Sequence, residues 1–549
     1  MRGRITHNVI CTVSLAGVAL MMAVSAALNR IPFPQLAFLD IAPAIAVLLS
    51  FAAAFSLFPK ASGYAFVFIC DAIAIYESIL GLMQAAGKAM IRHSLFTVTG
   101  TFDNPGPYGG FLAITGVVAL SFVLRHRKEK ISLDRQLFSV LQILSFLALM
   151  LVICVLPSTM SRTGWCAFIA GGVAAAAFAY GSEGCKKLAE TVRSHPWLFA
   201  LLCCAIIAGG VGAWSIKAPS ARGRVHIWKI DCITIAEHPL IGAGPSLHMG
   251  AYGEAQEHYF ASKQRSISSV VAAGCPEYPF NEYLGLGMKA GAAALLLALA
   301  FTVSAVPGLG RRCPEAAAAI VSFAVFASGS YPLSVPLLKY MAAALAGAAI
   351  SGKGFFPRRF LPVSAVVAVV FMICLAPALN LRRETEKEWK QCRVYSGIGL
   401  YEKQTKELLP MYSLLGNRFR YLYDLGYGLH KQGLISESQQ YLEEGSVLSS
   451  DPMFFNIMGK NLESEGDFNG AEKMYMKALA RVPGRLYPRS LLIDLYLCQG
   501  RDSDASRIAE EALTIPVNPR HIAMQELKTR IEHVADSLVN TRKNAIFTQ

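Results

Sequence analysis

Residues 37–58 read AFLDIAPAIAVLLSFAAAFSLF, and Asp40 is the one charged residue in this run. A helix needs about 20 mostly apolar residues to cross the hydrocarbon core of a bilayer. This run therefore predicts a membrane-spanning helix, and comparable runs recur along the chain. We predict about eleven spans, at approximately residues 8–28, 37–58, 62–82, 108–124, 136–156, 163–181, 197–216, 283–306, 315–331, 333–351 and 360–381.

The overall composition agrees with a membrane protein. Of 549 residues, 54% are hydrophobic and only 16% are charged, which is too apolar for an ordinary soluble enzyme. We therefore expect an all-α fold, in which a polytopic bundle of transmembrane helices is followed by a separate helical domain.

The basic residues predict the orientation of the bundle, because positively charged short loops stay on the cytoplasmic side. With eleven spans, every basic cluster falls on one face, and the N-terminus is predicted to be cytoplasmic. The net charge of +14 lies mostly in these loops, so it favours anionic lipid as the partner and not nucleic acid. The clusters are Arg2 and Arg4; Arg125, Arg127, Lys128, Lys130 and Arg135; Lys186, Lys187 and Arg193; Arg311 and Arg312; and Lys353, Arg358 and Arg359.

The C-terminal part has a different pattern, with an internal period. Gly433, Gly466 and Gly500 recur at intervals of 33 and 34 residues, which is the helix-turn-helix period of tetratricopeptide repeats. We predict a membrane domain at 1–381, a linker helix at 382–416 and extracytoplasmic repeats at 417–549. Stacked repeats offer a concave face to a partner protein, or they pack on the membrane domain, and the sequence leaves both roles open.

Four motifs are predicted to lie on the outer face. The first is GTFDNPG at 100–106, where Asn104 precedes Pro105 in a tight turn or helix break. The second is Ser158 to Gly164, where Ser161 precedes Arg162. An arginine there can bind two phosphate oxygens of a diphosphate, or extend to the bilayer interface as a structural residue.

The third motif is the large loop at 217–282, with six basic and six acidic residues. Its segment Arg224 to Asp231 has helical spacing, with Arg224 and Trp228 on one side, and predicts an amphipathic helix on the membrane. The loop histidines, His226 and His238 among them, lack the spacing of a zinc helix, so we predict no metal site. Cys232 and Cys275 share the loop, and whether they pair is left open.

The fourth motif is Glu277 to Gly285, at the start of a predicted span. A carboxylate at a membrane mouth can accept a proton from an attacking hydroxyl, which makes Glu277 and Glu282 candidate bases. Alternatively, Asn281 or Glu282 caps the helix that Tyr283 enters.

The order of these motifs, GTFDNPG, SRTG, RVHIW with EHPLIGAGPSLH, and FNEYL, resembles the O-antigen ligase and polymerase superfamily over about residues 95–300. The resemblance implies a metal-independent glycosyltransferase with a GT-C-like membrane fold and no cofactor, which acts in lipopolysaccharide biosynthesis of the cell envelope. Its donor is a glycan linked to undecaprenyl diphosphate, in the bacterial inner membrane. A tetratricopeptide tail resembles the version found in Bacteroidetes-type genomes.

By the same resemblance, Arg162 and Arg224 hold the donor diphosphate, with Arg222 a close competitor and His226 beside them. Gly242 and Gly244 form the turn after His238. Many ligases have a histidine directly before the asparagine of the last motif, and here Phe280 occupies that position. Two alternatives stay open: Glu277, Glu282 or a loop histidine takes over that role, or base catalysis contributes little.

The acceptor stays open at this point. Lipid A core, the end of another repeat unit, and a protein hydroxyl are all compatible, so the protein is a ligase, a polymerase or a protein O-oligosaccharyltransferase. A non-catalytic export or assembly scaffold is the alternative of another class. Transporters usually show inverted repeats with intramembrane charges; few such charges are present here, and Asp71 and Glu77 are the clearest.

Overall fold

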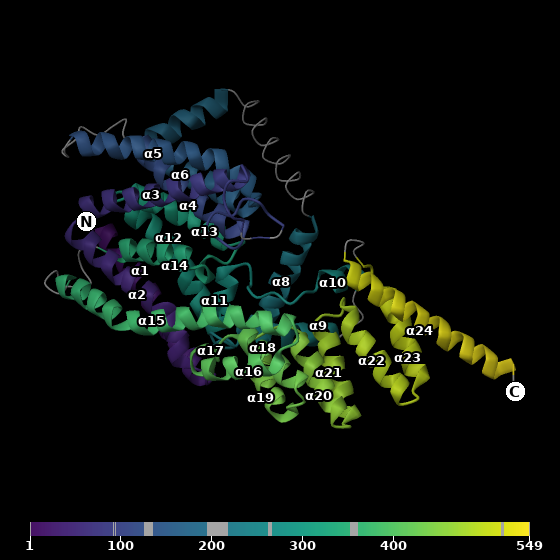
Figure 1. The fold of residues 1–549 in the computed structure, drawn as a ribbon. Helices are drawn as coiled ribbons and strands as arrows, with labels where there is room; N and C mark the ends of the chain where they lie inside the picture. Colours follow the sequence, from purple (N-terminus) through teal and green to yellow (C-terminus); the bar gives the residue numbers. More distant parts are fainter. Residues whose placement is uncertain are drawn as a thin grey trace. The chain divides into compact units, whose positions relative to one another are not determined.

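A computed structural model describes residues 2–91, 93, 95–125, 135–194, 218–261, 266–351, 361–517 and 521–547. The described residues form helices and loops, so the protein is an all-α polytopic membrane protein, as predicted. The chain divides into two compact units (Figure 1). The first unit comprises Met1–Val24, Phe38–Ala218 and Pro279–Pro377, and the second comprises Ser25–Ala37, Pro219–Tyr278 and Ala378–Gln549.

The first unit holds most of the apolar helices. They are α1 (Arg2–Leu28), α2 (Pro34–Leu57), α3 (Pro59–Ala85), α4 (Pro105–Arg125), α5 (Arg135–Val155), α6 (Arg162–Ser194), α11 (Glu282–Ala290), α12 (Ala292–Gly310), α13 (Pro314–Ala327), α14 (Pro336–Ile350) and the first part of α15 (Leu361–Gly397).

Eight helices among the described residues are long and apolar enough to cross a membrane. At the predicted spans 315–331 and 333–351 the structure instead has α13 and α14, which have only 14 and 15 residues. At about 1.5 Å per residue, such helices are shorter than a bilayer core of about 30 Å. Helix α13 begins at Pro314, and helix α14 begins at Pro336. The predicted span 197–216 lies outside the described residues.

Helix α4 forms the centre of the first unit and packs against α3, α5, α6 and α13 (Figure 1). Its side chains Phe111, Ile114 and Val118 are fully buried. A Cβ atom at Gly110 would overlap the Phe326 ring of α13. Small residues let helices approach closely in membranes, where lipid provides little hydrophobic driving force for association.

The predicted span 283–306 is interrupted. Helix α11 ends at Ala290 and α12 begins at Ala292, with Gly291 between them at φ 87°. Only glycine adopts this conformation without strain. The break makes α11 a nine-residue helix, and it fixes the direction in which the fourth motif enters the bundle.

The second unit combines the large loop with the C-terminal helices. Its helices are α8 (Ala218–Glu237), α9 (His248–Ala261), α10 (Ile267–Ala272), the second part of α15, α16 (Tyr401–Leu408), α17 (Tyr412–Leu415), α18 (Phe419–Lys431), α19 (Ile435–Ser446), α20 (Met453–Ser464), α21 (Phe468–Arg481), α22 (Leu486–Cys498), α23 (Asp502–Leu513) and α24 (Ile522–Phe547).

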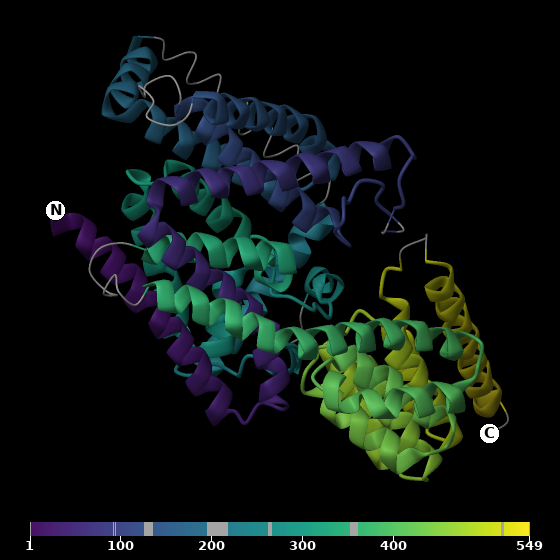
Figure 2. The same ribbon diagram turned by 60° about the vertical axis from the view of Figure 1, so that its left-hand side comes forward.

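Three helix pairs follow one another in this unit: α18 with α19, α20 with α21, and α22 with α23. They stand side by side in Figure 1, and Figure 2 shows the same part of the chain, in green and yellow, from another side. Gly433, Gly466 and Gly500, which set the period in the sequence, lie in the turns inside the pairs with φ of 76°, 81° and 69°. The helix–turn–helix units thus lie where the period places them, and their assignment to the tetratricopeptide class stays a prediction.

The loop that we assigned to the membrane domain packs, from residue 219 to 278, with the C-terminal helices in one compact unit. Helix α9 contacts α21 directly. A Cβ atom at Gly250 of α9 would collide with the backbone carbonyl of Val447. The domain boundaries 1–381, 382–416 and 417–549 themselves stay predictions.

Candidate functional site

The GTFDNPG turn is anchored on α3. The Gln84 side chain accepts hydrogen bonds from the Thr99 and Gly100 amides at 2.9 and 2.8 Å, and it donates to the Gly100 carbonyl at 2.9 Å. Glu77 accepts from the Thr101 amide at 3.0 Å. In the sequence, Glu77 stood out only as an intramembrane charge. In the structure it shapes the first motif.

Asn104 ends this turn and starts α4. Its side-chain oxygen accepts a hydrogen bond from the Gly106 amide at 2.8 Å. The first backbone N–H groups of a helix have no partner within the helix, and this bond supplies one of them with an acceptor. The predicted tight turn before a helix is therefore present at this position.

The second motif lies against the first. Ser161 Oγ donates to the Gly106 carbonyl at 3.1 Å, and Gly164 lies directly against the backbone of Gly109. Met160, at φ 50°, reverses the chain before α6 begins at Arg162. Left-handed backbone at a residue other than glycine costs about 1 kcal/mol or more and is enriched at functional sites.

The fourth motif is linked to the second through a segment that sequence reasoning did not single out, Ser328–Val335. Thr163 Oγ1 lies 3.5 Å from the Gly329 carbonyl, to which it donates. The Phe280 and Tyr331 rings meet edge to face at 5.2 Å. Buried Glu282 accepts a hydrogen bond from the Leu333 amide at 2.7 Å. The first two motifs and residues 279–285 of the fourth motif therefore come together within the first unit.

Gly329, Pro332 and Pro336 are turn signals in the sequence, and they were the only clue to this segment. Its apolar neighbours led us to place it inside two spans. A turn rich in glycine and proline between two short apolar runs is the signal that would have found it.

Asn281 caps α11, which was one of the two readings of the fourth motif. Its side-chain oxygen accepts from the Tyr283 and Leu284 amides at 3.0 and 3.2 Å. Phe280, at the position where many ligases have histidine, has φ 52°. Its backbone is strained and its ring packs on Tyr331, so the residue positions the motif without titrating.

A cavity of about 220 Å³ opens beside the fourth motif. Glu282, Tyr283 and Thr302 contribute polar atoms to a wall that is otherwise apolar, with Leu15 and Phe301 among its members. Such a lining accommodates an apolar chain and places a carboxyl group at its margin.

The third motif forms α8 in the second unit, as its helical spacing predicted. Arg222 is exposed, Arg224 and Trp228 are half-buried, and Asp231 and Thr234 are fully buried. The side with Ile230 and Thr234 is covered by protein, although we expected this helix to lie on the membrane. The exposed side carries Arg222 together with Val225 and Lys229.

His226 belongs to a buried network that ties α8 to α9. Its Nε2 lies 3.1 Å from Gln256 Oε1, and the same oxygen accepts from Tyr252 Oη at 3.1 Å. Burial lowers the pKa of His226, the hydrogen bond with Gln256 opposes this in part, and the charge of Lys229, the smallest of the three effects, lowers the pKa further. His226 is thus a neutral linker near pH 7, which makes it a poor cation for a diphosphate.

Three other predicted residues of the loop, Glu277, Gly242 and Gly244, have structural roles. Glu277 forms an ion pair with Arg420 of α18. Gly242 and Gly244 have φ of 68° and 105°, and the Gly242 amide bonds the His238 carbonyl at 3.1 Å. The turn predicted after His238 is therefore present.

Cys232 and Cys275 are both free thiols, so no bridge links them in this structure. Cys275 Sγ accepts a hydrogen bond from Arg485 at 3.0 Å. Among the described residues there is no cluster of three or more His, Cys, Asp or Glu side chains that would hold a metal ion.

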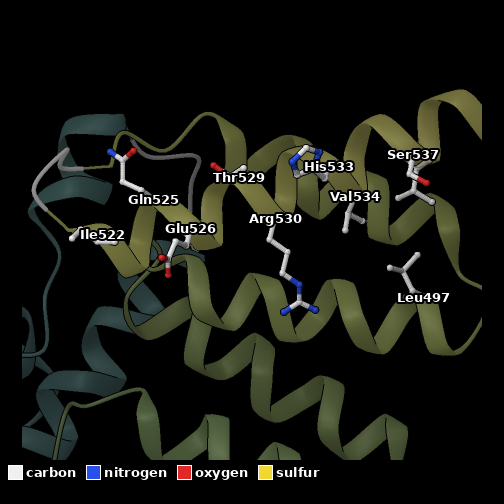
Figure 3. Close-up of a pocket in the computed structure, with 10 residues that line it drawn as sticks. Leu497, Ile522, Gln525, Glu526, Thr529, Arg530, His533, Val534 and Ser537 are labelled. Carbon is white, nitrogen blue, oxygen red and sulfur yellow. The ribbon is translucent and has the colours of Figure 1, made fainter.

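A groove of about 920 Å³ lies between α22 and α24 in the second unit (Figure 3). Arg530, Gln525 and His533 are among its lining residues, and Arg530 pairs with Asp494 at 2.8 Å. None of the residues predicted from the four motifs lines it.

The fold and the clustered motifs define a multi-pass, all-α membrane protein with a helical-pair unit attached. Residues 146–299 match the family model Wzy_C, described as O-Antigen ligase. The match includes Arg162, the whole of α8 and α9, and the capped helix α11. It supports a glycosyl-transferring enzyme of the membrane ligase or polymerase type. A search of curated proteins gives no match.

Proposed function

We propose that this protein is a membrane glycan ligase. It transfers an oligosaccharide or polysaccharide from undecaprenyl diphosphate to an acceptor such as lipid A core, with inversion and without a metal ion. The observation that carries the proposal is the O-Antigen ligase match over residues 146–299, together with the convergence of the first, second and fourth motifs. We place it in the bacterial inner membrane, with α8 and the helical pairs outside the cytoplasm.

In this proposal an acceptor hydroxyl attacks the anomeric carbon of the donor sugar. The new glycosidic bond forms as the bond to the diphosphate oxygen breaks, and the hydroxyl proton leaves to a carboxylate or to water. Negative charge grows on the departing diphosphate, which fixed guanidinium groups stabilise. Arg162, at the first turn of α6, and Arg224 or Arg222 on α8 supply those groups.

The contacts refine the roles within this proposal. His226 has a lowered pKa and bonds Gln256, so we assign it to positioning α8, and the charge on α8 comes from its arginines. Glu277 is engaged by Arg420. Glu282 bonds the Leu333 amide and borders the apolar cavity, so between the two it is the better placed base or positioning group.

The test is glycan transfer by purified protein from a synthetic lipid-linked donor, alongside complementation of a deletion strain. Arg162→Ala and Arg224→Ala are expected to lower transfer at least a hundredfold, because each removes a charged donor to the leaving group. Arg193→Ala, an exposed change at the other end of α6, and Lys229→Ala on α8 are the matched controls. Normal transfer in both arginine variants removes the proposal.

Alternative acceptors give distinct outcomes in the deletion strain. Loss of laddered lipopolysaccharide indicates a ligase, shortened chains indicate a polymerase, and loss of glycoprotein staining indicates a protein O-oligosaccharyltransferase. Purified protein that transfers nothing from any lipid-linked donor would instead support an export or assembly scaffold.

A further inference from the structure

The tyrosines of the second unit fall into two groups. Tyr421, Tyr475 and Tyr496 are fully buried, and their hydroxyls bond Leu408 O, Glu463 and Glu472 at 2.7 Å each. These three rings are core residues with satisfied hydroxyl groups. A second group is only half-buried: its members Tyr423 and Tyr427 pack against the core and keep part of their surface exposed.

In this second group the rings on α16 and α18 contact one another, and Tyr487 of α22 lies near enough to Tyr423 for an electrostatic effect. Tyr423 and Tyr427 of α18 stack with ring centroids 6.0 Å apart and an angle of 9° between the planes. Tyr401 of α16 meets Tyr427 edge to face at 6.0 Å. Burial raises the pKa of Tyr423, and Asp451, Tyr427 and Tyr487 of α22 add to the increase. We call Tyr401, Tyr427, Tyr423 and Tyr487 the tyrosine row.

Two lysines border the row. Lys431 Nζ lies 5.5 Å from the Tyr427 ring centroid. Lys460 Nζ lies 5.4 Å from the Tyr487 centroid and donates to its hydroxyl at 2.8 Å. Half-buried rings beside ammonium donors combine partly exposed apolar area with hydrogen-bonding groups.

The arginines around the row are each matched by a carboxylate. Arg393 lies 3.3 Å from Asp424, Arg485 lies 3.8 Å from Asp451, and Arg420 pairs with Glu277. Paired charges provide little attraction for an acidic peptide. The surface therefore suits a ligand with apolar faces and many hydroxyl groups.

The large loop adjoins the same helices. Ser450, just before α20, donates to the Pro276 carbonyl at 2.9 Å, and Glu277 pairs with Arg420 at the start of α18. A chain held on the tyrosine row thus lies close to residues 276–277 of the loop within one compact unit.

We propose that the tyrosine row is a glycan-binding site that holds the sugar chain of a substrate. Sugar rings carry C–H groups on their faces and hydroxyl groups at their edges, which match tyrosine faces and flanking lysines. The proposal rests on the glycan substrate of the proposed function, and it gives the helical pairs a substrate-binding role in place of a protein partner.

The test measures oligosaccharide binding to the full-length protein in nanodiscs by saturation-transfer NMR. One probe is the oligosaccharide released by mild acid from the lipid-linked donor, and the other is lipid A core oligosaccharide of the same strain. The double variant Tyr423→Ala, Tyr427→Ala is expected to raise the Kd at least fivefold. The double phenylalanine variant keeps the rings and is expected to bind within twofold of wild type.

Tyr441→Ala is the control, because Tyr441 is a half-buried tyrosine of α19 outside the row. If the double alanine variant does not fold, the single variant Tyr427→Ala serves in its place. Tyrosine-dependent binding of either oligosaccharide supports the proposal and identifies the row as a donor or an acceptor site. Binding of neither oligosaccharide, or binding that the alanine variants leave unchanged, overturns it.

Binding of a random dodecapeptide pool without any oligosaccharide binding would make the row a peptide site and also overturn the proposal. The two proposals fail separately, because the free oligosaccharide lacks the diphosphate. Arg162→Ala and Arg224→Ala are expected to bind it as wild type does. Full transfer activity in those variants would overturn the proposed role of the arginines at the diphosphate. It would not bear on glycan binding by the tyrosine row.

Discussion

Arg481 Nε, at the end of α21, lies 2.5 Å from Glu257 Oε1 on α9, 224 residues away in the sequence. The arginine is 1% exposed, and its Nη1 also donates to the Ser449 carbonyl at 2.8 Å. Gln256, next to Glu257, donates to the Arg481 carbonyl. This contact joins the large loop to the helical pairs.

Arg481→Met is expected to release α9 from α21. Breaking a buried ion pair from one side costs roughly 3–5 kcal/mol, because the remaining charge is left without its partner. Hydrogen exchange of the α9 amides should accelerate strongly, while exchange in α4 stays unchanged. Arg507→Met is the control, since its pair with Glu511 is exposed and lies within α23, and such a pair is worth about 0–1 kcal/mol. Equal exchange in the two variants would contradict this role of Arg481.

Gly250→Ala and Gly223→Ala are expected to have opposite effects. A Cβ atom at Gly250 meets the Val447 carbonyl, whereas a Cβ atom at Gly223 of α8 meets nothing within 4 Å. Overpacking costs about 1–3 kcal/mol, and alanine in an open helix position gains about 0.5–1 kcal/mol over glycine. Thermal unfolding of the two variants checks this, and the expectation fails if Gly250→Ala is as stable as Gly223→Ala.

Asp231→Asn is expected to stabilise the protein at high pH. Both carboxylate oxygens of Asp231 are buried and have no hydrogen-bond partner among the described residues, and burial raises its pKa well above the usual value. A raised folded-state pKa gives stability that is present below the unfolded pKa of about 3.9 and is lost as the pH rises.

The melting temperature of Asp231→Asn should therefore exceed that of wild type by about 2 °C or more at pH 8, with a smaller difference at pH 5. Asp536→Asn changes an exposed carboxylate of α24 and serves as the control. A uniform shift at both pH values would show that ionisation of Asp231 is not the cause.

Acid is expected to loosen the contact between α8 and α9. The pKa of His226 is lowered by burial, so its neutral form is favoured in the folded state. Its contribution to stability is present above the unfolded pKa of about 6.5 and is lost as the pH falls through the folded value.

Amide exchange of α8, corrected for intrinsic rates, should increase between pH 7.5 and pH 5 in wild type and less in His226→Gln, which does not titrate. His258→Gln, at an exposed histidine of α9, should respond as wild type does. The same acid response in all three proteins would exclude His226 as its source.

The sequence predicted what depends on local pattern. Apolar runs located the long helices, and helical spacing predicted α8. Asn281 was recognised as a possible helix cap because its side chain bonds backbone amides within the next three residues. Asn104 and Gly242 likewise lie in turns whose partners are local.

What the sequence could not predict depends on backbone dihedrals or distant contacts. The break at Gly291 is invisible in hydrophobicity, since apolar residues continue on both sides. The bond from the Leu333 amide to Glu282 and the pair of Arg481 with Glu257 join residues 51 and 224 positions apart. Asp231 is likewise buried by packing across the loop, and no pattern in the neighbouring sequence predicts that burial.

The central claim is that Arg162 and the arginines of α8 act from the same side of the membrane. Membrane-impermeant maleimide labelling of intact cells tests it, with Met160→Cys reporting on the second motif and native Cys232 reporting on α8. Met160 is 45% exposed and Cys232 is an exposed free thiol. Both positions are expected to react before the membrane is permeabilised. Reaction of one position before permeabilisation and of the other only afterwards would contradict it.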